Sequence, residues 1–267
     1  MTRVLVLYGF GLNCEEETAV AYTLAGARPS VVHAGDWFDG RVRLTDFDVL
    51  HLPGGFSFGD NLGAGRVLAN RLRFSTRPDG GKVWDEALTF TARGGRIIGV
   101  CNGFQALVKS GLLPNIGSAH AQEVSLAANA TGHFTNLWVK CKLHASAWSG
   151  AQAMDCEFPI RHGEGRIVFG SAEIERAVLE GGLVLLSYVD AAGQPTELHP
   201  ANPNGSPHGI AGLRSADGRV LGLMPHPEGF LFADVHPSSE RRTNGHGDGK
   251  RPDGLQFFES FLRSLKE

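Results

Sequence analysis

One cysteine, Cys101, stands where an apolar run ends and a helix-forming segment begins. The run Arg96–Val100 predicts a buried strand, and Phe104–Ser110 predicts a helix. A nucleophile on a sharp turn between a strand and a helix is lifted above the sheet, next to free backbone N–H groups and to a helix N-terminus that favours an anion. Gly99 and Gly103 leave that turn uncrowded. Cys101 is therefore a candidate nucleophile, and the alternative is a small, buried hydrophobic residue.

A histidine and a glutamate two residues apart are the second candidates for chemistry. His226 and Glu228 lie in the stretch LMPHPEG (223–229), and they share one face of an extended backbone. Pro225 and Pro227 favour that extended conformation. A carboxylate held against one imidazole nitrogen fixes the histidine tautomer and leaves the other nitrogen for a nucleophile such as Cys101. The alternative is a solvated turn with an ordinary histidine.

Attack on a carbonyl group creates an oxyanion, which needs two N–H donors. The residue after the nucleophile, Asn102, supplies one backbone N–H. Gly55 supplies the other, because a glycine in the turn Pro53-Gly54-Gly55 lets a substrate carbonyl approach the backbone. This turn follows the strand-like run Phe47–Leu52, so it falls at the same predicted sheet edge as Cys101.

The elements that must position these residues alternate between strand and helix in the first half of the chain, which favours an α/β fold with a central, mostly parallel sheet flanked by helices. The predicted strands are Val4–Tyr8, Ser30–His33, Phe47–Leu52 and Arg96–Val100. The predicted helices are Glu15–Ala25, Gly63–Arg73, Val83–Arg93 and Phe104–Ser110.

The second half of the chain favours antiparallel hairpins. Its predicted strands are Leu137–Leu143, Ile167–Phe169, Leu183–Tyr188, Ile210–Arg214 and Arg219–Met224. The last two flank an Asp-Gly turn, and Leu255–Leu265 has apolar residues at helical spacing. The sequence contains no repeat or long linker, so we expect a single domain over residues 1–267. The polar stretch Pro237–Pro252 predicts a surface loop.

Bulk composition narrows the class of protein. The formal net charge is −3, which argues against a nucleic-acid partner. The sequence has neither a signal-peptide pattern nor an apolar stretch of about 20 residues, so we expect no membrane association. The four cysteines are scattered without a C-x-x-C pair, which favours a reduced, cytoplasmic protein and argues against a metal site.

Taken together, these motifs resemble those of class I glutamine amidotransferases, whose signature is a G-x-C-x-G-x-Q elbow with a distant H-P-E. Here the signature corresponds to GVCNGFQ (99–105) and His226-Pro227-Glu228. The resemblance narrows to the glutaminase subunits or domains of phosphoribosylformylglycinamidine synthase. The further motifs that carry it are LPGGFSFGD (52–60), HGEGR (162–166), NPNGSPHGIAGL (202–213) and LMPHPE (223–228).

The resemblance implies an enzyme that hydrolyses L-glutamine and passes ammonia to a synthetase subunit, with or without a small accessory subunit, in purine biosynthesis. Cys101 would form the glutamyl thioester, His226 would act as general base and acid, and Glu228 would orient it. The implied glutamine-binding residues are Gly54, Gly55, Phe56, Ser57, Asn102 and Gln105. The resemblance implies no cofactor in this chain, because ATP and magnesium are expected on the synthetase. This chain also lacks a G-x-x-x-x-G-K-[ST] motif.

The sequence departs from that pattern in several places. Gly229 follows H-P-E where the family has an arginine, and the loop 9–17 keeps Cys14 but lacks the usual Pro-Gly-Ser or Pro-Gly-Thr. Extra residues fall around Arg71–Asp85 and Pro237–Pro252. We expect a structural role for Cys14, because the sequence places no H-P-E-like partner near it.

Two alternatives to a glutaminase remain open at this point. One is an unrelated cysteine hydrolase on a similar fold, and the other is a catalytically silent regulatory subunit. The stretch HGEGR is equally open, since it could contact the substrate or the synthetase or simply form a tight turn.

Overall fold

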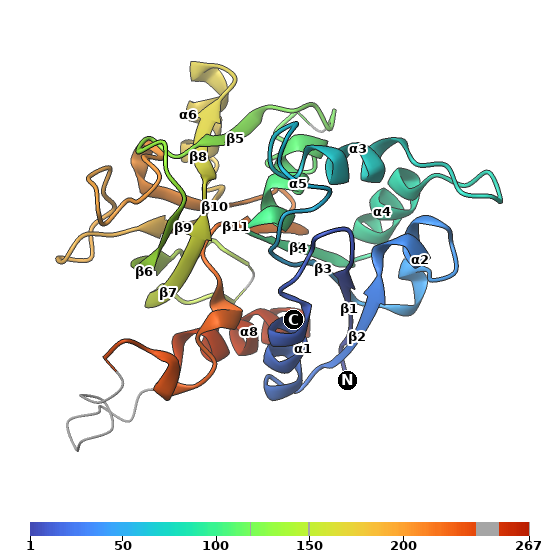
Figure 1. The fold of residues 1–267 in the computed structure, drawn as a ribbon, viewed down its shortest axis with the longest axis horizontal. Coiled ribbons are helices and arrows are strands. Elements are labelled where there is room, and N and C mark those ends of the chain that lie inside the picture. Colours follow the sequence, from blue (N-terminus) through green and yellow to red (C-terminus); the bar gives the residue numbers. More distant parts are fainter. Residues whose placement is uncertain (118, 149, 239–250, 267) are drawn as a thin grey trace.

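A nine-stranded sheet forms the centre of the computed structural model, which describes all residues except 118, 149, 239–250 and 267. The strand order is β2-β1-β3-β4-β11-β10-β9-β6-β7 (Figure 1). In chain order the strands of this sheet are β1 Arg3–Tyr8, β2 Arg28–His33, β3 Val49–Leu52, β4 Arg96–Val100, β6 Thr135–Leu143, β7 Met154–His162, β9 Val184–Tyr188, β10 Ile210–Arg214 and β11 Val220–Leu223. A separate two-stranded sheet pairs β5 (Val124–Ala128) with β8 (Glu164–Phe169).

The sheet has a parallel half and an antiparallel half. The strands from β2 to β11 in the sheet order run parallel to their neighbours. The apolar residues of β1 from Val4 to Leu7 are fully buried, as expected for a parallel strand with helices on both faces. From β11 to β7 each strand is antiparallel to its neighbour. The predicted α/β fold with antiparallel hairpins in the second half is therefore confirmed.

Helices cover the two faces of the parallel half. Figure 1 shows α1 (Glu15–Leu24) and α8 (Asp253–Ser264) together on one side of the sheet. On the other side lie α3 (Arg66–Phe74), α4 (Val83–Ala92) and α5 (Asn102–Ser110). Two peripheral helices complete the set, α2 (Ala34–Phe38) and α6 (Ala172–Glu180). No helix in the described part of the chain combines the length and apolar character that a membrane crossing requires.

Three neighbouring parallel strands end at the same level of the sheet, and this positions the site. In the register, Leu52 of β3 pairs with Gly99 of β4, and Leu223 of β11 pairs with Val100 of β4. The segments that follow these strands therefore leave the sheet at one edge, where ligands bind in open α/β sheets.

Several elements lie outside the sequence predictions. The strand β7 contains Pro159, which removes a backbone donor, but β7 is the last strand of the sheet, where proline is tolerated. The prediction also lacked β5, α2 and α6. Helix α5 begins at Asn102 instead of Phe104, because the turn after β4 is a single residue.

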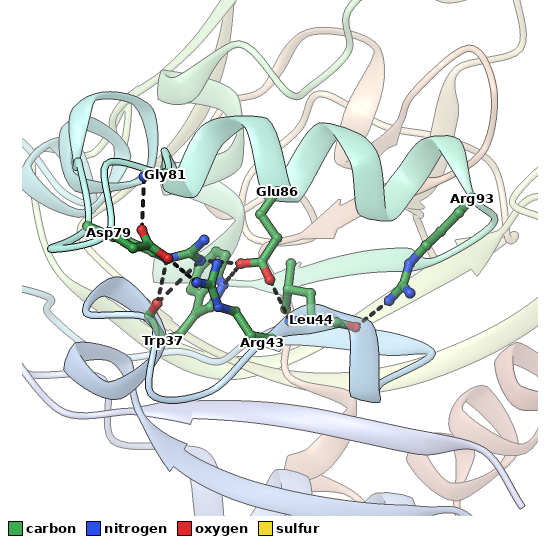
Figure 2. Close-up of polar contacts among 8 residues, drawn as sticks. Trp37, Arg43, Leu44, Asp79, Gly81, Glu86 and Arg93 are labelled. Atoms are coloured by element: carbon green, nitrogen blue, oxygen red, sulfur yellow. Dashed lines mark hydrogen bonds and ion pairs between the residues drawn. The ribbon is translucent and has the colours of Figure 1, made fainter.

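The predicted extra segment Arg71–Asp85 is anchored by a polar network (Figure 2). Arg77, whose side chain is 1% exposed, forms an ion pair with Glu86 at the start of α4. The same carboxylate accepts hydrogen bonds from Trp37 Nε1 and from the backbone N–H of Leu44, both at 2.9 Å. The largely buried carboxylate of Glu86 thus ties α4 to the segment around α2. Most of the second predicted extra segment, Pro237–Pro252, lies outside the described residues.

Candidate active site

Cys101 occupies a strained turn between β4 and α5. Its φ is 50° and its ψ is −106°, a left-handed conformation that non-glycine residues rarely adopt. The adjacent glycines are required by packing, because a Cβ on Gly103 would lie 1.9 Å from Leu52 O. A Cβ on Gly99 would lie 2.6 Å from the Gly103 carbonyl carbon. The geometry is that of a nucleophile elbow, as predicted from the sequence.

The two predicted oxyanion donors are free. Within the described part of the chain, no acceptor is hydrogen-bonded to the backbone N–H of Asn102 or of Gly55. The Gly103 N–H donates to Pro53 O at 3.2 Å, which holds the elbow against the turn that contains Gly55. Gly55 has a φ of +142°, and a Cβ there would lie 2.3 Å from Gly11 O. Packing of the N-terminal loop therefore requires this glycine, whereas the sequence argument invoked only access of substrate.

His226 and Glu228 form a buried dyad. His226 Nδ1 and Glu228 Oε1 are 2.6 Å apart, and the side chains are 1% and 0% exposed. Burial alone would lower the pKa of His226, but the charge of Glu228 and the nearby thiol of Cys101 raise it well above its ordinary value. Burial alone would likewise raise the pKa of Glu228, and the partner imidazole lowers it. The three residues predicted as a catalytic triad are thus brought together at one sheet edge.

A second thiol, that of Cys14, lies against the same imidazole. Cys14 is buried, and its pKa is raised by burial, with His226 opposing the rise. A Cβ on Gly54 would lie 3.1 Å from Cys14 Sγ and 2.6 Å from His226 Cε1, so the glycine makes room for both side chains. The expectation that Cys14 has no H-P-E-like partner is wrong. The partner is the H-P-E segment itself, brought close by folding.

A pocket of about 300 Å³ has Cys101 in its wall. The other lining residues come from the loop after β3, from α5, from β5, from the segment before β6, and from the end of β7 and the start of β8 with Gly163 between them. They are Gly55, Phe56, Asp60, Gln105, Ala128, Phe134, Arg161, His162, Gly163 and Glu164. Three of the residues predicted to bind glutamine, Gly55, Phe56 and Gln105, are in this wall.

The other three predicted glutamine-binding residues brace the wall from behind. Gly54 packs against His226. The Ser57 N–H donates to Asn102 Oδ1 at 3.1 Å, and Asn102 Nδ2 donates to Gln105 Oε1 at 3.0 Å. Gln105 in turn donates from Nε2 to Glu164 O at 2.6 Å, so its side-chain amide joins α5 to the start of β8. The direct contacts of these residues with a substrate stay a prediction.

The stretch HGEGR contributes to the pocket, and it runs from the end of β7 through a bend at Gly163 into β8, so the tight-turn interpretation is wrong. His162 and Glu164 line the pocket, and burial lowers the pKa of His162 to about 3. Glu164 Oε2 accepts from the Ala64 N–H at 3.1 Å and lies 3.4 Å from Lys109 Nζ. Burial and the charge of Glu164 raise the pKa of Asp60, and Asp60 Oδ1 is buried without a hydrogen-bond partner among the described residues.

The departure at Gly229 has a structural explanation. A Cβ at this position would lie 2.6 Å from Pro159 Cγ and 3.3 Å from Arg161 Nη2. A side chain at position 229 would therefore clash with Pro159, and one guanidinium nitrogen of Arg161, from β7, lies in close contact with the position of its Cβ. Sequence reasoning missed Arg161 and Asp60 as site residues. The sequence offered one signal for each: Arg161 directly precedes HGEGR, and Asp60 is the last residue of the stretch LPGGFSFGD.

Comparisons with known proteins agree with this geometry. Residues 1–262 match the model of the CobB/CobQ-like glutamine amidotransferase domain. A phosphoribosylformylglycinamidine synthase subunit PurQ from Dehalococcoides mccartyi is 36% identical over 267 residues, covering 99% of this chain and 98% of the relative. Its namesake from Methanococcus maripaludis strain C7 is 34% identical, covering 88% of this chain and 85% of the relative.

Solved structures give the same result for the fold. A chain in the structure of PurLQS from Thermotoga maritima aligns with a TM-score of 0.70 and 29% identity, covering 99% of this chain and all of that chain. Another glutamine amidotransferase from Thermotoga maritima, 13% identical, aligns with a TM-score of 0.50 over all of this chain and 96% of that one. The second likeness is one of fold alone.

Proposed function

Because this chain belongs to the CobB/CobQ-like glutamine amidotransferase domain family, we propose that it is the glutaminase subunit of a phosphoribosylformylglycinamidine synthase. In this role it hydrolyses L-glutamine and delivers the ammonia to a synthetase subunit for purine biosynthesis. The observation that carries the proposal is the shared end of β3, β4 and β11, which collects Gly55, Cys101 and the His226–Glu228 dyad at one sheet edge.

The reaction begins with attack of Cys101 Sγ on the carboxamide carbon of glutamine. His226 accepts the thiol proton and returns it to the departing nitrogen, so that a C–S bond forms and the C–N bond breaks. Glu228 holds the imidazole through Nδ1 and stabilises its protonated form, in agreement with the raised pKa of His226. The products of this step are ammonia and a glutamyl thioester.

The oxygen of the tetrahedral intermediate needs donors that are already in place. The free N–H groups of Gly55 and Asn102 meet this requirement, because the donors are paired with no other acceptor in the described chain. Water then attacks the thioester, with His226 as base, and releases glutamate through a second oxyanion. One donor in such a site is worth about 10²- to 10³-fold in kcat.

The charges around the pocket suit the α-carbon end of glutamine, which carries an ammonium and a carboxylate group. Arg161 is exposed at the pocket, where its guanidinium can bind a carboxylate in a bidentate manner. Asp60 and Glu164 supply negative charge for the ammonium group, and the unpaired Oδ1 of Asp60 is an available acceptor. We assign these three side chains to recognition of the substrate zwitterion.

A partner is required because formation of an amidine from an amide needs activation. We place ATP and magnesium on the synthetase subunit, with no cofactor in this chain, and we place the complex in the cytoplasm. Phe56 and Phe134 are 47% and 56% exposed beside the pocket, with their ring centres 6.3 Å apart. Exposed apolar side chains at the rim are suited to a partner that covers the pocket and retains ammonia.

The proposal is tested by assaying this chain alone and with the synthetase subunit. We expect weak glutamine hydrolysis by the isolated chain, a strong rise on addition of the partner, and glutamine-dependent formation of the amidine product. Equal hydrolysis with and without the partner, or no amidine formed from glutamine, would contradict the proposal.

A further inference from the structure

Three buried side chains place a sulfur, a nitrogen and an oxygen ligand within coordinating reach of one another. The Cys14 Sγ, one ring nitrogen of His226 and one carboxylate oxygen of Glu228 all lie within 4.8 Å of each other. The relative exposures of these residues are 4%, 1% and 2%. Thiolate, imidazole and carboxylate form a common donor set for Zn²⁺ and related cations.

The cluster also contains polar atoms without partners. In the described part of the chain, His226 Nε2 and Glu228 Oε2 are buried without a hydrogen-bond partner. The mechanism uses Nε2 for the Cys101 proton, because Nδ1 is held by Glu228, so Glu228 Oε2 is the atom that the mechanism leaves unexplained. Buried polar atoms without partners are uncommon and point to a missing ligand or a functional role. Gly54 leaves the space between Cys14 and His226 free of a side chain.

We propose that Cys14, His226 and Glu228 form a site for a thiolate-seeking divalent cation such as Zn²⁺, and that occupation of this site switches the enzyme off. Zinc bonds of about 2.0–2.3 Å require ligand atoms about 3.3–3.6 Å apart, so donors at the 4.8 Å limit need to close by roughly 1.2–1.5 Å. On binding, the Cys14 thiol and the His226–Glu228 hydrogen bond each release one proton to solvent, and the cation takes the place of both protons.

Inhibition follows because the cation competes with the catalytic use of His226. A coordinated imidazole is no longer oriented by Glu228 toward Cys101, so it cannot move the thiol proton. This part of the inference rests on the proposed function, whereas formation of the metal site rests only on the three side chains. Cys14 thereby acquires a role that the hydrolysis of glutamine does not assign to it.

The first test uses Co²⁺ as a spectroscopic probe on the full chain. In a Cys101→Ala background, Cys14 is the thiol left in the cluster, and we expect a sulfur-to-cobalt charge-transfer band that Cys14→Ala abolishes. The isosteric Cys14→Ser variant keeps the volume of the side chain and should also lose the band, and a thermal melt confirms that each variant is folded. Absence of the band in the Cys101→Ala background, or its persistence in Cys14→Ala, would overturn the site.

The second test measures inhibition of the wild-type complex by Zn²⁺. The concentration for half-inhibition, normalised to the activity of each variant, should rise about tenfold or more in Cys14→Ala and Cys14→Ser. The control is Cys141→Ala, which removes a buried thiol from β6 and should leave the value unchanged. An unchanged value in both Cys14 variants would refute the switch. A protein without glutaminase activity but with the cobalt band would instead contradict the proposed function.

Discussion

A single methyl group added at Gly54 provides a test of how the dyad is positioned. A Cβ at this residue would lie 2.6 Å from His226 Cε1 and 3.1 Å from Cys14 Sγ. Because Gly54 is absent from the residues with positive φ, alanine imposes no left-handed strain there. The effect of Gly54→Ala is therefore steric, and it acts on the imidazole.

The size of the displacement sets the expected loss. Carbon atoms in contact are separated by about 3.5–4.0 Å, so the ring or the Gly54 backbone must move by roughly 1 Å. The imidazole is tied to Glu228 at 2.6 Å, and the backbone leads directly into the predicted oxyanion donor Gly55. A misplacement of about 1 Å in a catalytic group lowers the rate about 100-fold.

The assay is steady-state glutamine hydrolysis by the reconstituted complex, with the melting temperature measured in parallel. Gly54→Ala should lose about 100-fold in kcat while remaining folded. The matched control is Gly117→Ala, where the nearest atom to the new Cβ is 3.6 Å away and kcat should not change. A folded Gly54→Ala enzyme that retained more than half of the wild-type kcat would refute the placement of His226.

Three further predictions concern recognition, stability and pH. Arg161→Ala should raise KM for glutamine about 10- to 100-fold with little change in kcat, because it removes hydrogen bonds between the guanidinium and the charged substrate. The control Arg166→Ala, on β8, should leave KM unchanged. Equal KM values in wild type and Arg161→Ala would rule out the assigned contact. Arg77→Met leaves the largely buried carboxylate of Glu86 without its counter-charge, so urea denaturation should show a loss of about 3 kcal/mol, against less than about 1 kcal/mol for the exposed pairs broken by Arg41→Met. Burial lowers the pKa of His51 to about 4, so the unfolded chain binds a proton between pH 6.5 and 4 that the folded chain excludes, and the free energy of unfolding falls as the pH falls. His51→Gln should remove about 2 kcal/mol of the stability lost between pH 7.5 and 5, and identical pH profiles would contradict this assignment.

The elbow at Cys101 and the His226–Glu228 dyad were predictable because their signals are local. A strand, one turn residue and a helix are encoded in consecutive residues around Cys101, and two prolines fix the relation of His226 to Glu228. The two segments were expected to lie close together because the carboxyl ends of neighbouring parallel strands lie at one edge of a sheet. The register of β3, β4 and β11 places the two segments there.

The position of Cys14 was not predictable, because nothing periodic in the sequence encodes the path of its loop. Three backbone hydrogen bonds tie this loop to the segment after β3, from the Asn13 N–H to Gly54 O, from the Phe56 N–H to Gly11 O and from the Phe58 N–H to Phe10 O. Such contacts depend on two irregular segments that meet only in the folded chain. The sequence therefore showed that Cys14 carries a thiol, but it could not show that this thiol lies beside His226.

The position of Arg161 in the pocket wall was hidden for a related reason. Its strand, β7, contains a proline and charged residues, so the sequence pattern does not predict a strand there. Arg161 lies next to Gly229, the residue after H-P-E, although 68 positions separate the two residues in the sequence. Only the folded structure therefore shows that an arginine from another strand lies beside the glycine that stands where the family has an arginine.

The most direct test of the mechanism is the site of covalent labelling by a glutamine-analogue electrophile. Two thiols, Cys101 and Cys14, lie beside one imidazole, but only Cys101 is in the wall of the pocket. Peptide mass spectrometry should find the label on Cys101 alone, and excess glutamine should prevent the reaction. Labelling of Cys14 instead, or full glutamine hydrolysis by Cys101→Ala, would contradict the assignment of the nucleophile.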